Sequence, residues 1–165
     1  MAVANNKSTV ITNADATPPT INSSYLARGA VYEAVGIATV AAADDDNSVY
    51  RIARVPSNAR VTSLKLNNAA ITGSSAWIAG FYDTAAVNSG AIIGSGNQLM
   101  TTKDISAGLT VPTECLTVTA ANSEKRVWEL LGLSSDPNKQ YDICLTANTV
   151  GSAAGTVGCR IQYVV

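Results

Sequence analysis

The sequence contains no histidine. This absence excludes the Ser-His-Asp triad, the Cys-His catalytic pair and every zinc site that uses an imidazole ligand. The three cysteines, Cys115, Cys144 and Cys159, lack the close paired spacing of a structural zinc site. Lys7 is followed by polar residues, so we recognise no apolar export signal that would favour disulfides. We therefore expect buried free thiols.

Charge is also scarce. Only 14% of the residues are charged and the formal net charge is −1, whereas soluble proteins average about 25% charged residues. The chain lacks the broad basic surface of a nucleic-acid-binding protein, and it has no apolar run of the roughly 20 residues that cross a membrane. We predict no nucleic acid and no membrane as partners. Low charge favours a protein whose surface is partly covered by neighbours.

Acidic and aromatic residues offer little catalytic chemistry. Asp44, Asp45 and Asp46 form the one acidic cluster, and with Asn47 they could supply oxygen ligands to calcium. The segment lacks the length and ligand spacing of an EF-hand, so a solvated turn between strands is the favoured interpretation. A glycosidase needs two carboxylates across a sugar-binding cleft, and aromatic residues, common in such clefts, make up only 5% here. We predict that the protein is not an enzyme and uses no cofactor or metal.

What the sequence does contain is alternation. From Val157 to Val165 apolar residues occupy the odd positions, with Gly158, Arg160 and Gln162 between them. A period of two indicates a strand with one buried and one solvated face. Other strand candidates lie at spacings near ten residues and are separated by turn-forming residues. They cover 31–40, 49–55, 61–67, 77–82, 91–93, 99–101, 116–119 and 141–147.

One helix is predicted over 124–131, where apolar residues are spaced by three and four, and Gly132 then ends it. Residues 94–112 are punctuated by glycine and are expected to form loops, with one short strand at 99–101 among them. A parallel α/β fold would need repeated crossover helices. Seven or eight short strands with one short helix instead predict an all-β protein, an antiparallel β-sandwich or jelly roll whose body spans 28–165.

Residues 1–27 are predicted to form an extended N-terminal arm. The segment is polar, and Pro18 and Pro19 enforce extended backbone. Spaced apolar residues within it are predicted to anchor the arm on a partner surface. These anchors are Val10, Ile11, Ile21, Tyr25 and Leu26. A disordered tail is the alternative.

Four larger side chains have roles that depend on the direction in which they point. Arg51 and Arg54 have opposite parity, so we expect them on opposite faces of the sheet, paired with carboxylates of the same or a neighbouring subunit. Trp128 lies on the apolar side of the predicted helix and is expected in the core. Trp77 opens a strand after a flexible turn, and both an interface position and a core position stay open for it.

Several segments of the sequence resemble segments of a group of tailed-bacteriophage virion proteins. The run 49–66, with Arg-Val-Pro-Ser-Asn-Ala-Arg-Val at its centre, is one of them. The others are Lys-Arg-Val-Trp-Glu-Leu-Leu-Gly-Leu at 125–133, Asp-Pro-Asn-Lys-Gln-Tyr-Asp at 136–142 and Leu-Thr-Ala-Asn-Thr-Val-Gly at 145–151. The resemblance covers about residues 30–165. It implies a small protein of the phage structural module, a capsid decoration (cement) protein made alongside the major capsid protein.

Such proteins commonly have β-sandwich or jelly-roll bodies and sit as oligomers on the outside of the shell. The resemblance therefore implies a non-enzymatic structural protein, made in the bacterial host cytoplasm, that lies on the outer surface of the virion capsid. There it would stabilise the shell by bridging adjacent major capsid protein subunits. We expect a homo-oligomer, with a trimer favoured over a dimer. The alternative is a carbohydrate- or receptor-binding β-sandwich module on the phage particle.

Overall fold

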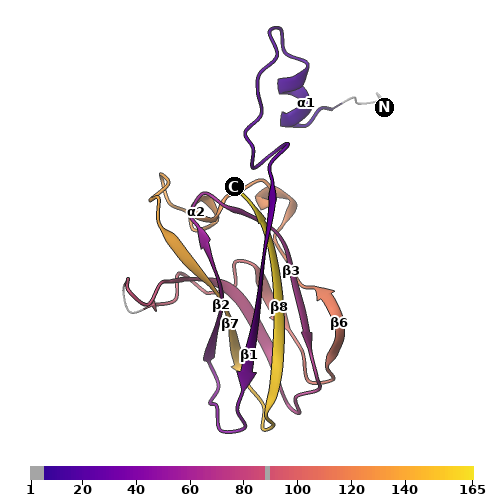
Figure 1. The fold of residues 1–165 in the computed structure, drawn as a ribbon, viewed down its shortest axis with the longest axis vertical. Coiled ribbons are helices and arrows are strands. Elements are labelled where there is room, and N and C mark those ends of the chain that lie inside the picture. Colours follow the sequence, from indigo (N-terminus) through magenta and orange to yellow (C-terminus); the bar gives the residue numbers. More distant parts are fainter. Residues whose placement is uncertain (1–5, 88–89) are drawn as a thin grey trace, which may run out of the picture.

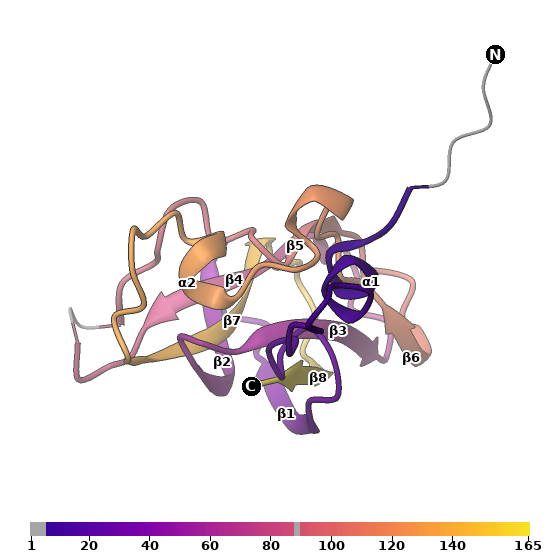
Figure 2. The ribbon, with the colours of Figure 1, turned by 90° about the horizontal axis from the view of Figure 1, so that it is seen from above.

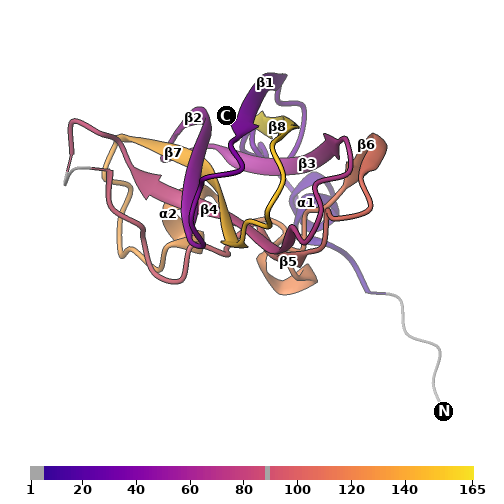
Figure 3. The same ribbon diagram turned by 90° about the horizontal axis from the view of Figure 1, so that it is seen from below.

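The computed structural model describes residues 6–87 and 90–165, and their strands form two four-stranded antiparallel sheets packed face to face (Figure 1). Sheet A contains, in spatial order, β1 (Val31–Val40), β8 (Gly155–Val164), β3 (Arg60–Asn68) and β6 (Leu109–Glu114). Sheet B contains β2 (Ser48–Pro56), β7 (Gln140–Thr149), β4 (Ser75–Asp83) and β5 (Met100–Lys103). The two layers are visible from both ends of the molecule (Figure 2, Figure 3).

The strand pairing is that of a jelly roll. β4 pairs with β5, β3 with β6, β2 with β7 and β1 with β8, so the chain is one long nested hairpin. Rolling up this hairpin places β8 beside β3 and β7 beside β4, which gives the two sheets. The predicted all-β antiparallel sandwich is therefore confirmed.

The core lies between the sheets and is built by alternate residues of each strand. In β7, for example, Tyr141, Ile143 and Leu145 point inward and are fully buried. Trp77 is also fully buried. Its ring stacks on Tyr50 with the centroids 5.3 Å apart, and its indole nitrogen donates a 2.7 Å hydrogen bond to the side chain of Ser74. Trp77 is therefore a core residue, and the interface position is excluded for it.

The helices are short. α2 (Val127–Leu130) is the predicted helix, but it is shorter than 124–131 and has Val127 as its only buried residue. Trp128 is half-buried, with its ring 4.9 Å from the Arg126 guanidinium, so the expected core position is wrong for it. A further helix, α1 (Thr9–Ala14), and a 3₁₀ turn, η2 (Ala120–Asn122), are found in addition. No helix of the described residues is long and apolar enough to cross a membrane.

Three predictions between β4 and α2 differ from the structure. β6 begins inside the segment 94–112 expected to form loops, and 116–119 contains no strand. The side chain of Glu114, at the end of β6, explains the second difference. It accepts hydrogen bonds from the backbone amides of Leu64 (2.9 Å) and Leu116 (3.1 Å), so the amide of Leu116 is bound to a carboxylate and not to a strand. Pro112 is tolerated because β6 is an edge strand. The predicted strand at 91–93 is reduced to a single bridge between Tyr82 and Ile92.

Candidate interaction surface

The outer face of sheet B, turned away from sheet A, is covered by the chain itself over β4 and β7, whereas Val49 on β2 stays 42% exposed. Segment 90–99 follows the edge of β4, where the amides of Ile93 and Leu99 donate to the carbonyls of Phe81 (3.2 Å) and Ala79 (3.0 Å), and between these two contacts it folds over the sheet. The backbone of Gly96 comes so close to Gly80 that a Cβ atom on Gly80 would lie 2.3 Å from it. Outward-facing residues of β4 and β7 are consequently buried. They are Ile78, Tyr82, Asp142, Cys144 and Thr146.

A charged cluster closes one end of this outer face. The carboxylate of Asp142 receives hydrogen bonds from Arg51 (2.8 Å) and, in a bidentate contact, from Arg54 (2.6 and 3.2 Å). The prediction that the two arginines point to opposite faces is wrong, because a β-bulge between Arg51 and Ala53 shifts the alternation by one residue. Burial acts to raise the pKa of Asp142, but the hydrogen bonds from both arginines outweigh it and hold that pKa below its usual value.

Sheet A is different, because its outer face carries an uncovered apolar strip along the edge strand β1. The strip consists of Val31, Val35 and Ile37, which are 61%, 61% and 74% exposed. They share the face with Glu33, whose carboxylate lies 3.7 Å from Arg160 on β8. Exposed apolar surface of this kind marks interaction sites.

The strip ends in a groove of about 390 Å³ on the same outer face, which we call the sheet A groove. Its lining includes Ile37, Asn67, Ala69, Leu109, Thr156 and Gly158. Gly158 keeps the floor open, since a Cβ atom there would lie 2.7 Å from the side-chain oxygen of Asn67. The groove therefore combines an apolar wall with an amide that can bind a backbone group.

The arm leaves the body at the opposite end of the strip and stands beyond the sandwich (Figure 1). Its root, residues 24–28, is fixed to the body. Ser24 donates to the carbonyl of Val165 (2.9 Å), and Arg60 donates to the carbonyl of Tyr25 (2.8 Å). The guanidinium of Arg126 lies 4.7 Å from the centre of the Tyr25 ring, a distance at which a cation attracts the ring face.

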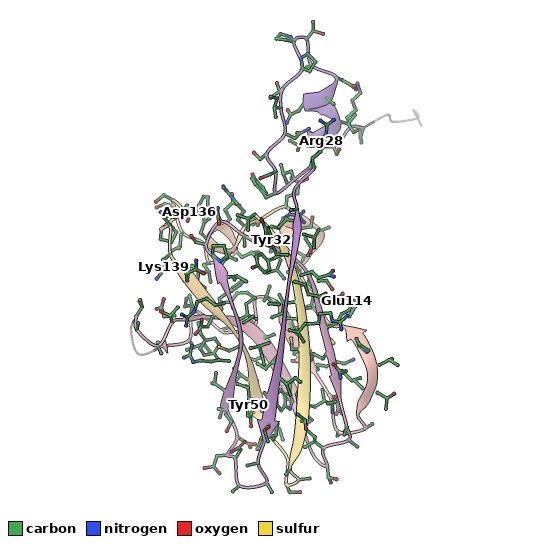
Figure 4. The ribbon with its side chains drawn as sticks, in the orientation of Figure 1. Arg28, Tyr32, Tyr50, Glu114, Asp136 and Lys139 are labelled. Carbon is green, nitrogen blue, oxygen red and sulfur yellow. The ribbon has the colours of Figure 1, made fainter. Side chains whose placement is uncertain are left out.

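Beyond the root, the arm closes on itself and is not extended throughout. α1 packs beside the returning chain, where Asn13 donates to the side chain of Asn22 (2.8 Å) and Asn22 donates to the carbonyl of Val10 (3.2 Å). A hollow of about 370 Å³ lies against this loop, and Arg28 lines it. Figure 4 shows Arg28 at the base of the arm and Tyr32 where β1 begins.

The five predicted anchors fall into two groups. Tyr25 and Leu26 are half-buried at the root, and Val10 is half-buried inside the loop of the arm. Ile11 and Ile21 remain 48% and 96% exposed. The structure thus leaves Ile11 and Ile21 free to contact another molecule, and partner binding by the anchors stays a prediction.

The remaining candidates have structural roles. All three cysteines are free and buried, as expected, and burial raises the pKa of Cys144 and Cys159 to about 12. In the acidic turn, Asp44 accepts hydrogen bonds from the amide of Ala41 and the hydroxyl of Tyr50, and Asp46 accepts one from the amide of Val150. Within 6–87 and 90–165, no three His, Cys, Asp or Glu side chains are grouped as they would be around a metal.

Sequence reasoning missed the apolar strip. The signal was present, because residues 31–40 carry apolar residues at both parities: Val31, Val35 and Ile37 on one face, and Ala38 and Val40 on the other. A strand that is apolar on both faces must be covered twice. Since the described part of the chain covers only the inner face of β1, the outer face is left as a candidate interaction surface.

Searches among known proteins return structural neighbours only. No family model matches the sequence, and no curated protein does. A chain of the capsid of Ralstonia phage GP4 superposes with a TM-score of 0.61 at 12% identity, over 82% of this chain and 84% of that one. A chain of the Cyanophage Pam1 capsid asymmetric unit gives 0.48 at 17% identity, over 83% and 86%. A chain of the acidic stable capsid of Helicobacter pylori bacteriophage KHP30 gives 0.46 at 15%, over 82% and 87%. At such identities the likeness to the GP4 chain establishes a shared fold.

Proposed function

We propose that this chain is a non-enzymatic structural protein of a bacteriophage virion. In this proposal it lies on the outer surface of the capsid and stabilises the shell by bridging adjacent subunits of the major capsid protein. It is made in the cytoplasm of the bacterial host and acts as a homo-oligomer, with a trimer favoured over a dimer.

The observation that carries the proposal is the uncovered apolar strip of sheet A beside an arm with a fixed root. A chain that encloses one sheet on both faces and leaves valines and an isoleucine of the other in water has a surface suited to a protein neighbour. The fold shared with a chain of the GP4 capsid supports a phage particle as the setting. The sequence phrases at 49–66 and 125–133 support the same setting.

Bridging would strengthen the shell through multivalency. Once one copy is bound to a shell subunit, a second contact to the next subunit becomes intramolecular, whether the arm makes it directly or holds a further copy that makes it, and two weak contacts gain a factor of about 10²–10⁴ in combined affinity. The fixed root and the Asn13–Asn22 hydrogen bond order part of the arm in advance. Pre-ordering reduces the entropy that the arm loses when it docks.

Co-sedimentation with undecorated phage shells tests this function. We expect the full-length chain to bind saturably, near one copy per shell subunit, and to make the shells harder to disrupt. Removing residues 2–24 should leave the circular dichroism of the body unchanged but weaken binding at least about tenfold, because the second contact is lost. Val49→Ser, which alters an exposed valine on β2, serves as the matched control and should bind like the parent chain. Failure of the full-length chain to bind would refute the proposal.

A carbohydrate- or receptor-binding module is the alternative function, and it requires exposed Trp and Tyr gathered in a groove. Trp77 is buried, and the described residues that line the sheet A groove include no aromatic side chain. A hollow of about 480 Å³ over sheet B includes Tyr82 in its lining, but this side chain is only 3% exposed. No observation therefore favours this alternative. Copy number discriminates between the two: a shell-binding protein is near-stoichiometric with the shell subunit, whereas a receptor-binding protein is scarce in the particle.

A further inference from the structure

We propose that the arm of one copy lies on the outer face of sheet A of a second copy, with Ile21 and Ile11 covering the apolar strip and reaching the sheet A groove. The inference rests on the proposed function, since it assigns the self-contacts of that homo-oligomer. It differs from the function itself, because it names the occupant of the strip as this same chain.

The arm contains a short helix and apolar side chains that are exposed to water. α1 has six residues and none of them is buried. A helix of this length is not stable in water without tertiary contacts. Asn13 and Asn22 hold the loop of the arm together and Val10 is half-buried in it, but Ile11 and Ile21 are 48% and 96% exposed. Ile11 and Ile21 therefore lack a covering surface among the described residues of their own copy.

The strip and the groove are exposed apolar surfaces that the side chains of such an arm would cover. Val35 and Ile37 project from a strand whose outer face is covered by no segment of residues 6–87 and 90–165, and the groove beside Ile37 has a glycine floor at Gly158. A groove of this kind accepts a branched aliphatic side chain against Ile37 and Leu109. The amide of Asn67 at its rim can bond to the backbone of an incoming segment.

The arm does not reach the groove of its own copy. Val31 lies close to the root, whereas Ile37 lies six residues further along β1, which is about 20 Å in a strand. The root is held by Arg60 and Arg126 so that the arm continues away from the sandwich (Figure 1). An arm that is fixed at its root and points away from the groove of its own copy is placed to reach the groove of a neighbouring copy.

The two surfaces carry few charges. Lys7 and Asp15 are the only charged residues in segment 6–24, and they pair with each other at 2.7 Å. On the side of the strip, Glu33 is paired with Arg160. Lys65 on β3 lies opposite Arg160 on the same face, and it belongs neither to the strip nor to the groove lining. Segment 6–24 supplies about 20 residues, and a stable interface has roughly 20–30 residues a side.

The exchange is compatible with closed symmetry. Each copy offers one arm and one strip, so a reciprocal exchange around a two-fold axis and a ring of copies both satisfy every arm and every strip. The ring of three copies is the arrangement that corresponds to the trimer favoured above.

Two measurements without shells test the inference. Light scattering should give the full-length chain a mass of three copies, and both removal of residues 2–24 and Ile37→Ser should raise the dissociation constant at least tenfold. Val49→Ser should leave it unchanged. In the second measurement, copies carrying Ile21→Cys are mixed with size-tagged copies carrying Ile37→Cys and then oxidised. A disulfide between tagged and untagged chains is expected, because the native thiols are buried with raised pKa values and do not compete.

The outcomes separate the inference from the function on which it rests. A full-length chain that is monomeric and still binds shells would place the arm on a shell subunit, and this would overturn the inference but not the function. An oligomer that persists undiminished in Ile37→Ser and forms no mixed disulfide would also overturn it. An oligomer that forms the disulfide but ignores shells would uphold the inference and refute the function.

Discussion

The two sheets of this sandwich share one core but treat their outer faces in opposite ways. The outer face of sheet B is covered over β4 and β7, because segment 90–99 folds over it and Arg51, Arg54 and Asp142 close its end. Sheet A presents two valines and an isoleucine of β1 to water. The difference indicates where stability and interaction reside: the outer face of sheet B serves the fold, and the outer face of sheet A is available to a partner.

The same substitution on the two outer faces gives the largest expected contrast. Ile78 on β4 is 8% exposed, so Ile78→Ser should cost about 2–5 kcal/mol of unfolding free energy, through lost packing and a buried hydroxyl. Ile37→Ser on β1 should change it by no more than about 0.5 kcal/mol, because the side chain already lies in water. Urea denaturation of both variants, under conditions where the chain is monomeric, measures the two values. Equal losses would show that the strip is part of the folded core and would break the comparison.

A pair of strand glycines sharpens the contrast at the level of the backbone. Gly80→Ala would place a Cβ atom 2.3 Å from the backbone of Gly96, which cannot give way without moving segment 90–99. We expect a cost of about 1–3 kcal/mol, or about 2–4 °C in Tm for each kcal/mol. Gly158→Ala meets only the exposed, flexible side chain of Asn67 and should cost no more than about 0.5 kcal/mol. Thermal denaturation followed by circular dichroism checks both, and a larger loss for Gly158→Ala would contradict the prediction.

The contrast between the sheets also shows what local sequence can and cannot reveal. The alternation of apolar and polar residues located β1, β2, β3, β4, β7 and β8 to within about two residues. It does so because a strand with one buried and one solvated face needs apolar and polar residues in turn. It could not give the strand order, since β1 pairs with β8 from the far end of the chain. Alternation also could not predict the bulge after Arg51, because one extra residue in a strand does not change the composition in a recognisable way. That extra residue nevertheless places Arg54 on the same face of the sheet as Arg51.

The candidate site was predicted only in part for the same reason. The polar arm and its anchors followed from composition, but the division between Tyr25 at the root and Ile21 in water depends on where Arg60 and Arg126 lie in the fold. The strip on β1 was missed because exposure is decided by what covers a face, and segment 90–99 covers sheet B instead of sheet A. β6 was missed because it contains Pro112, which only an edge position tolerates.

The smallest expected effect concerns charge. Asp142→Asn should lower the unfolding free energy by about 1–2 kcal/mol at about pH 7, since it weakens charge-assisted hydrogen bonds to two partly exposed arginines. Because the folded-state pKa of Asp142 is lowered, its contribution is present above the unfolded-state pKa of about 3.9 and is lost as the pH falls through the folded-state value. The difference in unfolding free energy between variant and parent chain should therefore shrink from about pH 7 to about pH 3 in urea denaturation.

Glu33→Gln on sheet A, which alters an exposed pair, is the control and should change the unfolding free energy by less than about 0.5 kcal/mol at either pH. A gap for Asp142→Asn that is the same at both pH values would mean that the Asp142 charge contributes nothing to the enclosure of sheet B, and the stability difference between the outer faces would then rest on packing alone.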